Sequence, residues 1–447
     1  MKNNQELLTG RIFPTLLKFA IPFLIANLLQ ALYGAADLVI VGYFADAAGV
    51  VAVATGSQVM QTITGIVVGL TTGGTVLIGQ YLGANKKEAI SEIVGNMISL
   101  FAVIACILTV IMAFGANPIA QFMHTPVEAL KDTIHYINIC ALGILFITGY
   151  NSVSGILRGL GDSKTPLIFV AIACMINIIV DIILVGALKW GARGAAVATI
   201  TAQGLSFLLA LVYLKKKGVP FEFGRQHIRF VPVKIKAIFK VGLPIALQDA
   251  LVNISFLIIT AIINSRGLID AAAVGVVEKV IVFAMLPPTA FASAIAAMAT
   301  QNMGAGKVER AKKCLYTGIG CSAIFGLLCL LYGQGDSSLL MGMFTKDQEV
   351  IVASSLYFRS YSIDCLMVCV IFCMNGFLSG CGHSLFAMIH SLIATFLVRI
   401  PIAYGLSRLT EMTLYEIGLA APIASMVSIV ICVIYMKTGR WKKTVIE

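Results

Sequence analysis

The sequence predicts an all-α protein that crosses a membrane about twelve times, as two parallel six-helix repeats around a central cavity. Hydrophobic residues make up 59% of its 447 residues and charged residues 12%, whereas soluble domains contain about 45–50% and about 25%. The hydrophobic residues form runs of at least the roughly 20 residues that span a bilayer. Two short segments recur at one fixed separation, which indicates an internal duplication. A barrel is excluded, because it needs short alternating strands.

We expect six spans in each half of the chain. In the first half they lie near 13–43, 51–81, 94–116, 134–157, 166–187 and 195–214. In the second half they lie near 241–264, 272–301, 314–333, 350–378, 386–406 and 417–436. Pro22 and the Pro287-Pro288 pair are natural kink sites, because proline has no backbone N–H to donate. The first span lacks a small-residue cleavage pattern, so we expect it to be retained rather than removed as a signal peptide.

The duplication rests on two pairs of segments. GQYLGANK at 79–86 matches TQNMGAGK at 300–307, and GILRGLGDS at 155–163 matches GFLSGCGHS at 376–384, each 221 positions apart. Six spans return the chain to the side where it started, so the two copies share one orientation about an axis along the membrane normal. We therefore expect an N-terminal lobe at 1–217, a basic linker at 218–239 and a C-terminal lobe at 240–447.

The net charge of +11 is a topology signal rather than a footprint for nucleic acid. If the N-terminus is cytoplasmic, 23 lysines and arginines fall on the cytoplasmic side and six on the other. The positive-inside rule then places both termini and the linker in the cytoplasm. No nucleic-acid-binding motif is present, and the eleven cysteines form neither a disulfide framework nor a zinc pattern. We expect a multi-pass protein of the cytoplasmic membrane.

Four polar residues within the first-half spans are the candidates for chemistry, since such residues are costly in a bilayer and usually functional. They are Asp37, Asn177, Asp181 and Thr199. Asn177 lies one helical turn from Asp181 and shares its face, and all four fall in one layer of the outer half of the membrane. Such an oxygen-rich set suits Na⁺, or a proton on a carboxylate. The alternative is that the two aspartates only hydrogen-bond neighbouring helices or face water.

The second half does not repeat this set, because an offset of 221–222 positions places Asp37 on Ile259, Asn177 on Val398 and Asp181 on Ile402. It has other polar residues within its spans, among them Asp364, Arg399 and Asn253, which we assign to a substrate path. Ion pairing of Glu278 with Arg359 and Arg399 is the structural alternative. Gly65, Gly69 and Gly73 in the second span have the spacing that lets two helices approach closely in lipid.

The chain resembles the multidrug and toxic compound extrusion (MATE) transporters over essentially its whole length. The resemblance lies in the segment around Asp37, the Gln-x-x-Gly-Ala loops at 80–84 and 301–305, and LRGLGDSKTP at 157–166. It implies two six-helix bundles around a central cavity that opens alternately to each side. Asp37, Asn177, Asp181 and Thr199 look like the cation site that prokaryotic members have in the first lobe. An acidic pair that other members have in the second lobe is not matched here.

We therefore expect a secondary active antiporter, not an enzyme, that exports organic and mostly cationic small molecules in exchange for inward Na⁺ or H⁺. It would need no cofactor and no bound metal beyond the coupling ion, and would work in the lipid bilayer as a monomer. Cation binding at Asp37 and Asp181 would reshape the first lobe, with Pro22 as the hinge. The alternative is a lipid-linked saccharide flippase of the same superfamily, which should need a strongly cationic cavity. A passive channel is a weaker rival.

Overall fold

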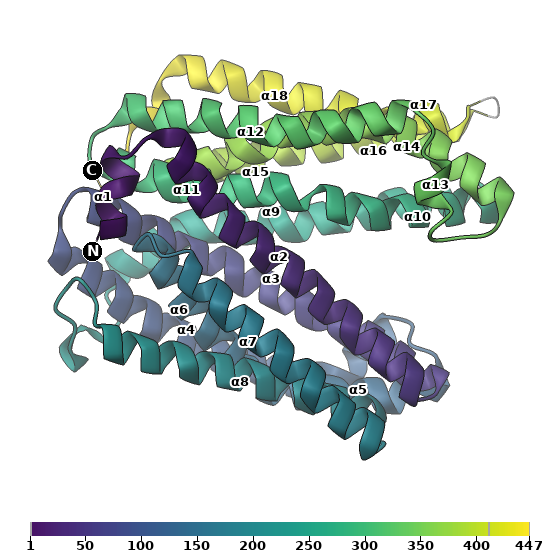
Figure 1. Cartoon of the computed structure of the whole chain (residues 1–447), viewed down its shortest axis with the longest axis horizontal. Coiled ribbons are helices and arrows are strands. Elements are labelled where there is room, and N and C mark those ends of the chain that lie inside the picture. Colours follow the sequence, from purple (N-terminus) through teal and green to yellow (C-terminus); the bar gives the residue numbers. More distant parts are fainter. Residues whose placement is uncertain (1, 410–411, 447) are drawn as a thin grey trace. The chain divides into compact units, whose positions relative to one another are not determined.

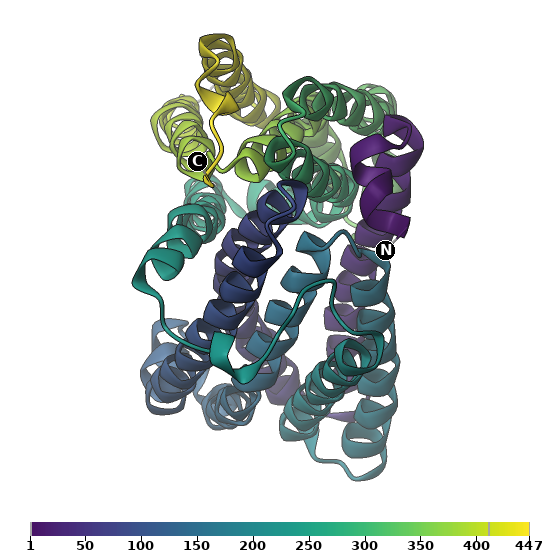
Figure 2. The same cartoon turned by 90° about the vertical axis from the view of Figure 1, so that its left-hand side faces the viewer.

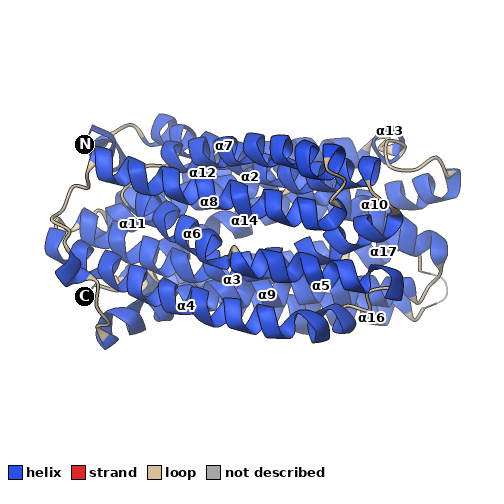
Figure 3. Cartoon of the chain, turned by 90° about the horizontal axis from the view of Figure 1, so that it is seen from below, coloured by secondary structure: helices blue, strands red, loops and turns tan. Residues whose placement is uncertain are grey.

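The computed structural model describes the backbone of residues 2–409 and 412–446, which forms helices and loops and contains no strand (Figures 1 and 3). Side chains are described from Glu6 onward within these ranges. Eleven helical stretches of this part of the chain are long and apolar enough to cross a membrane. A bent helix pair makes a twelfth when it is counted as one span. The predicted all-helical class and number of spans are thus confirmed.

The first half forms a short N-terminal helix followed by six spans. Its helices are α1 (Lys2–Thr9), α2 (Ile12–Phe44), α3 (Ala47–Gly83), α4 (Lys87–Phe122), α5 (Val127–Leu142), α6 (Ile144–Gly159), α7 (Lys164–Asp181) and α8 (Gly191–Lys217). The fourth predicted span is not one straight helix, because α5 and α6 meet at Gly143 with a bend of 49°. A Cβ at Gly143 would lie 2.4 Å from Cγ2 of Ile200 on α8, so the bend coincides with a close approach of the two helices.

The second half follows the same plan. Its helices are α9 (Pro232–Asn264), α10 (Leu268–Ala284), α11 (Leu286–Gly304), α12 (Val308–Gln334), α13 (Ser338–Met341), α14 (Gln348–Cys381), α15 (Ser384–Leu392), α16 (Ile400–Ser407), α17 (Leu414–Gly418) and α18 (Ala420–Thr438). The helix between Leu268 and Gly304 is interrupted at Met285, directly before the predicted kink at Pro287-Pro288. Short 3₁₀ turns lie at Arg225–His227 (η2) and Arg440–Lys442 (η4).

Two spans contain a wider π-helical turn. In the first half η1 (Ile182–Ala187) continues α7 directly after Asp181, and in the second half η3 (Ile393–Arg399) joins α15 to α16. Each lies in the fifth span of its half. A π-helical turn holds one residue more than an α-helical turn, and such turns are frequent at functional sites.

The helices pack into two compact units. The first consists of Met1–Asn4 and Ile25–Ala246, and the second of Gln5–Leu24 and Leu247–Glu447. The helices α2 and α9 each contribute their first part to one unit and their second part to the other. The lobe boundaries expected from the sequence, at 217 and 239, remain a prediction.

The repeated loop segments form the same turn in both units. Asn85 and Gly306 both have positive φ angles, 58° and 71°, where α3 turns into α4 and α11 turns into α12. Gly161 and Gly382 do the same with φ of 85° and 94° after α6 and α14. Left-handed backbone favours glycine, and asparagine tolerates it better than most residues. These residues recur 221 positions apart because the same left-handed backbone conformation is needed at the same turn in both units.

Glycines also allow close helix contacts within the first unit. A Cβ on Gly73 would lie 2.2 Å from the backbone oxygen of Ile238, and one on Gly69 would lie 2.6 Å from Cα of Ala246. These glycines face the first turns of α9, where Gly242 in turn approaches Leu70. The predicted role of the glycine run in close packing is therefore found at two of its three positions. Gly65 has no atom within 4 Å of such a Cβ.

The linker between α8 and α9 is folded against α4 rather than extended into solvent (Figure 2). Ser91 donates a hydrogen bond to the carbonyl of Glu222 at 2.6 Å, and Asn96 accepts one from the N–H of Val231 at 2.6 Å. The linker carbonyl of His227 would lie 1.9 Å from a Cβ at Gly95, so the backbones touch. The linker therefore belongs structurally to the first unit.

Candidate functional site

The structure brings the four polar residues predicted for the first lobe together inside the first unit. Asp37 comes from α2, Asn177 and Asp181 from the last turns of α7, and Thr199 from α8. Asp37 is 3% exposed, and Asn177 and Asp181 are fully buried. Helical spacing explains part of this arrangement, because Asn177 and Asp181 are one turn apart on α7. Burial of two carboxylates rules out the alternative that they face water.

Few hydrogen bonds satisfy this cluster. Thr199 Oγ1 donates to Asp37 Oδ2 over a long 3.4 Å, and Asp37 also lies near enough to Asp181 and Asn177 to interact with them. Among the described residues, Asp37 Oδ1, both carboxylate oxygens of Asp181 and both polar atoms of Asn177 have no hydrogen bond of normal geometry. Buried polar groups are normally paired, and an unpaired buried charge is costly. The donor set therefore fits a small hard cation or a proton.

A tyrosine that was missed in the sequence completes the cluster. Tyr33 lies one turn before Asp37 on α2, and its hydroxyl is buried without a hydrogen bond of normal geometry. It interacts with Thr199, Asp37 and Asp181. Its four-residue spacing from Asp37, which places both on one face of α2, is the sequence signal that could have identified it.

Residues of α5 enclose the cluster from another side. Tyr136 and Cys140 both interact with Asp37 and are 2% and 0% exposed. The hydroxyl of Tyr136 is hydrogen-bonded to Ser57 Oγ on α3 at 3.1 Å. Helices α2, α3, α5, α7 and α8 thus all contribute to the surroundings of the two carboxylates. Among the described residues, those of this cluster included, no group of three or more His, Cys, Asp or Glu could hold a metal ion.

The polar residues of the second unit have a different arrangement. Asp364 on α14 is 4% exposed and accepts a hydrogen bond from Ser425 Oγ at 2.5 Å. The guanidinium of Arg399 lies 4.6 Å from the ring centre of Phe256 and donates to the hydroxyl of Tyr361 at 3.5 Å. Asn253 is exposed on α9 and donates to the carbonyl of Asp249. The predicted substrate path is therefore not one cluster in this unit.

The ion pairs considered for the second half are not formed in the described part of the chain. Glu278 Oε1 accepts a hydrogen bond from Thr260 at 3.0 Å, and Arg359 donates to Gln334 Oε1 at 3.4 Å. Arg399 instead contacts aromatic rings. Glu278 and Arg359 are thus paired with neutral hydrogen-bond partners, and Arg399 with aromatic rings, in place of the expected ion pairs.

The predicted hinge residue lies within an uninterrupted helix. Pro22 is inside α2, and the assignment of α2 changes from the second unit to the first between Leu24 and Ile25. A proline inside a helix removes a backbone hydrogen bond and favours bending at that point. Its position, two residues before this change, is suited to a hinge.

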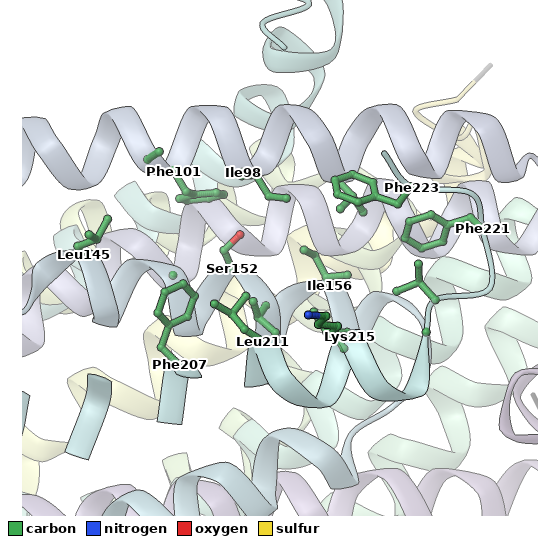
Figure 4. A pocket seen from close by; sticks show the side chains of 17 residues that line it. Ile98, Phe101, Leu145, Ser152, Ile156, Phe207, Leu211, Lys215, Phe221 and Phe223 are labelled. Carbon is green, nitrogen blue, oxygen red and sulfur yellow. The ribbon is translucent and has the colours of Figure 1, made fainter. Parts of the chain in front are cut away.

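The first unit also contains an apolar cavity of about 550 Å³ between α4, α6, α8 and the start of the linker (Figure 4). Phe101, Phe207 and Phe221 are among its lining residues, and its polar side chains are Ser152 and Lys215. None of the residues of the carboxylate cluster lines it. The two features are therefore separate.

Comparison with known proteins identifies the family of this chain. The family model described as MatE matches twice, over residues 22–183 and 244–405. The chain is 25% identical to the probable multidrug resistance protein YoeA of Bacillus subtilis over 432 residues, 95% of this chain and 93% of the relative. It is 25% identical over 449 residues to the probable multidrug resistance protein NorM of Thermotoga maritima, covering 96% of this chain and 93% of the relative.

A solved structure shares the fold. It is described as a MATE in the bent conformation and superposes with a TM-score of 0.92, covering all of both chains at 21% sequence identity. The twofold match of the family model also agrees with the internal duplication that the loop segments indicate.

Proposed function

Because the chain belongs to the MatE family of multidrug and toxic compound extrusion transporters, we propose that it exports organic, mostly cationic compounds in exchange for inward Na⁺ or H⁺. The transporter class follows from the family; the coupling ion and the charge of the substrate are the proposal. Relatives described as multidrug resistance proteins support an exporter rather than a lipid-linked saccharide flippase.

The observation that carries the proposal is the buried pair of carboxylates in the first unit. Asp37 and Asp181 interact with each other, and three of their four oxygens have no hydrogen bond of normal geometry among the described residues. Two such groups cannot both stay ionised in a membrane interior without a cation or a proton nearby. Asn177 and Thr199 add neutral oxygens to complete a shell for Na⁺.

Coupling requires that the cation and the substrate stabilise different conformations of the transporter. We assign this role to the first unit, where binding of a cation removes the repulsion between Asp37 and Asp181 and draws α2, α7 and α8 together. Pro22 lets α2 bend in response, and the fold neighbour described as bent supports such a motion. On release of the cation the carboxylates repel again, and the helices relax.

The substrate path remains a prediction for Asn253, Asp364 and Arg399. Asn253 is exposed on α9 and can contact a substrate, whereas Asp364 is buried at 4% exposure. We propose that the protein works as a monomer in the cytoplasmic membrane, with both termini in the cytoplasm. The excess of cations on one side of the predicted spans supports this orientation.

The test is ethidium efflux from vesicles that contain the purified protein, under separately imposed Na⁺ and pH gradients. The gradient that drives efflux identifies the coupling ion. Asp37→Asn and Asp181→Asn variants should lose gradient-driven efflux to the level of protein-free vesicles. Asp46→Asn is the matched control, since Asp46 is an exposed N-cap of α3 and asparagine caps helices equally well. Full activity of both site variants at normal expression would contradict the proposal.

A further inference from the structure

The bounds of the two family-model matches give an offset that relates residues of one unit to residues of the other. The matches are 222 positions apart at both ends, whereas the loop segments before the fifth spans are 221 apart. We assign the one-residue difference at the end of the second match to the π-helical η3, because η3 lies between the loop at 376–384 and that end. With this assignment the offset at the end of η3 is 222 rather than 221. Arg399 rather than Val398 then corresponds to Asn177, and Ala403 rather than Ile402 corresponds to Asp181.

The other site positions have lost their oxygens in the second unit. Asp37 corresponds to Ile259, and a shift of 221 would give Ile258 instead. Thr199 corresponds to Ala421 or, with the smaller shift, to Ala420. Ile259, Ala403 and Ala421 are all buried in one apolar cluster. The second unit has thus replaced the carboxylates and the hydroxyl with hydrocarbon and the amide with a cation.

The surroundings of Arg399 match those of the first-unit site. Tyr357 and Tyr361 lie 221 positions after Tyr136 and Cys140. Tyr136 and Cys140 both interact with Asp37, and Tyr357 and Tyr361 both interact with Arg399. The guanidinium therefore occupies the part of the second unit that corresponds to the carboxylate cluster of the first.

Asp364 supplies the opposite charge. It interacts with Arg399, although among the described residues no ion pair within 4.0 Å joins them, and its Oδ1 is held by Ser425. Glu278 also interacts with Tyr357, and its Oε1 accepts a hydrogen bond from Thr260. The positive charge of the Arg399 guanidinium balances the negative charge of the Asp364 carboxylate without an added ion. The two carboxylates of the first unit have no such built-in positive charge.

We propose that the guanidinium of Arg399 is a permanently attached substitute, in the second unit, for the cation that the first unit binds and releases. This rests on the proposed cation coupling at Asp37 and Asp181. The second unit then stays in the form that the first unit adopts only with its cation bound. The transporter has one exchangeable cation site, and Arg399 and Asp364 position helices α9, α14 and α18 rather than contact the coupling ion.

The experiment measures thermal unfolding of the purified full chain in detergent as Na⁺ concentration and pH are varied. Wild-type protein should be stabilised by one of the two cations, with a rise in Tm of about 2 °C or more, and Asp37→Asn should abolish the response. In the Asp37→Asn background, Arg399→Met should create a new cation-dependent rise of similar size, because Asp364 has lost its attached partner. Adding Asp364→Asn should remove that rise, and Arg399→Lys should not produce it.

The outcomes separate this inference from the proposed function. A wild-type response that survives Asp37→Asn contradicts the first-unit site, whatever the Arg399 variants do. A flat response of Asp37→Asn/Arg399→Met, or a rise that survives Asp364→Asn, overturns the attached-cation role. If Arg399→Met alone yields no folded protein, the Arg399→Met/Asp364→Asn double variant decides. If the double variant folds, the charges of Arg399 and Asp364 compensate each other, as proposed. If the double variant gives as little folded protein as Arg399→Met alone, the proposal is overturned.

Discussion

Replacing Gly73 with alanine should force α3 away from the first turns of α9. The added Cβ would lie 2.2 Å from the backbone oxygen of Ile238 and 2.7 Å from the backbone nitrogen of Gly242. Ordinary contacts of this kind begin near 3.4 Å, so the helix backbones must separate by roughly 1 Å. Neither neighbour is a flexible side chain that can move aside. Overpacking of this kind costs about 1–3 kcal/mol.

Gly65 on the same helix provides the matched control. A Cβ there has no atom within 4 Å, and alanine is favoured over glycine inside a helix by about 0.5–1 kcal/mol. The two substitutions are chemically identical and two turns apart, so their difference isolates the close contact. We expect Gly65→Ala to leave the unfolding temperature unchanged or raised, and Gly73→Ala to lower it by several degrees, at roughly 2–4 °C per kcal/mol.

The assay is thermal unfolding of both purified variants in the same detergent, followed by circular dichroism. Activity in the ethidium assay adds a second measure, because α9 has residues in both units. Equal unfolding temperatures for Gly73→Ala and Gly65→Ala would refute the packing argument, since helix propensity alone treats the two sites alike.

Three further predictions concern other parts of the chain. Pro22→Ala should slow ethidium efflux per folded molecule while raising thermal stability, because a helix-interior proline costs about 3 kcal/mol; an unchanged rate argues against the hinge. Burial raises the pKa of the Asp162 carboxyl, but hydrogen bonds from Thr165 and the nearby ammonium of Lys217 outweigh it and hold that pKa below its usual value. The stabilisation is therefore complete above about pH 5, beyond the unfolded pKa of about 3.9, and is lost as pH falls through the lowered pKa of the folded protein. Asp162→Asn should thus cost about 1 kcal/mol of unfolding free energy at pH 7 and nothing in strong acid, and a pH-independent difference in Tm contradicts this. Gly382→Ala should cost about 1–2 kcal/mol in unfolding free energy, because its φ of 94° is strained for any residue with a Cβ, and an unchanged Tm would count against this.

The membrane spans were predictable from the hydrophobic composition of the chain, and the duplication was predictable from the constant spacing of the repeated segments. Continuous apolar runs fix the number of helices, and the turns at Gly161 and Gly382 need glycine wherever they occur. The clustering of Asp37 with Asp181 was also predictable, since depth in a membrane follows from residue count along each span.

Other features of the structure have no recognisable pattern in the sequence. A π-helical turn needs one additional residue but no particular side chain, so η1 and η3 could not be read from hydropathy. The bend at Gly143 coincides with a close contact to Ile200, 57 positions away in the sequence, and only the packed structure shows that contact. The role proposed for Arg399 likewise required the register between the two copies, which we take to change by one residue across η3.

The assignment of the chain's first helical turns to the second unit has a consequence for biosynthesis. The carbonyl of Leu7 accepts a hydrogen bond from Asn302 at 3.1 Å, and Leu16 is fully buried in a core that includes Met298 and Leu315. At about 5–20 residues per second, roughly 15 to 60 s separate synthesis of these partners. During that time the N-terminal segment has been made but its binding site has not. During membrane insertion this segment must therefore wait without its packing partners until the last third of the chain has been made. A product truncated before that point would leave the apolar face around Leu16 uncovered.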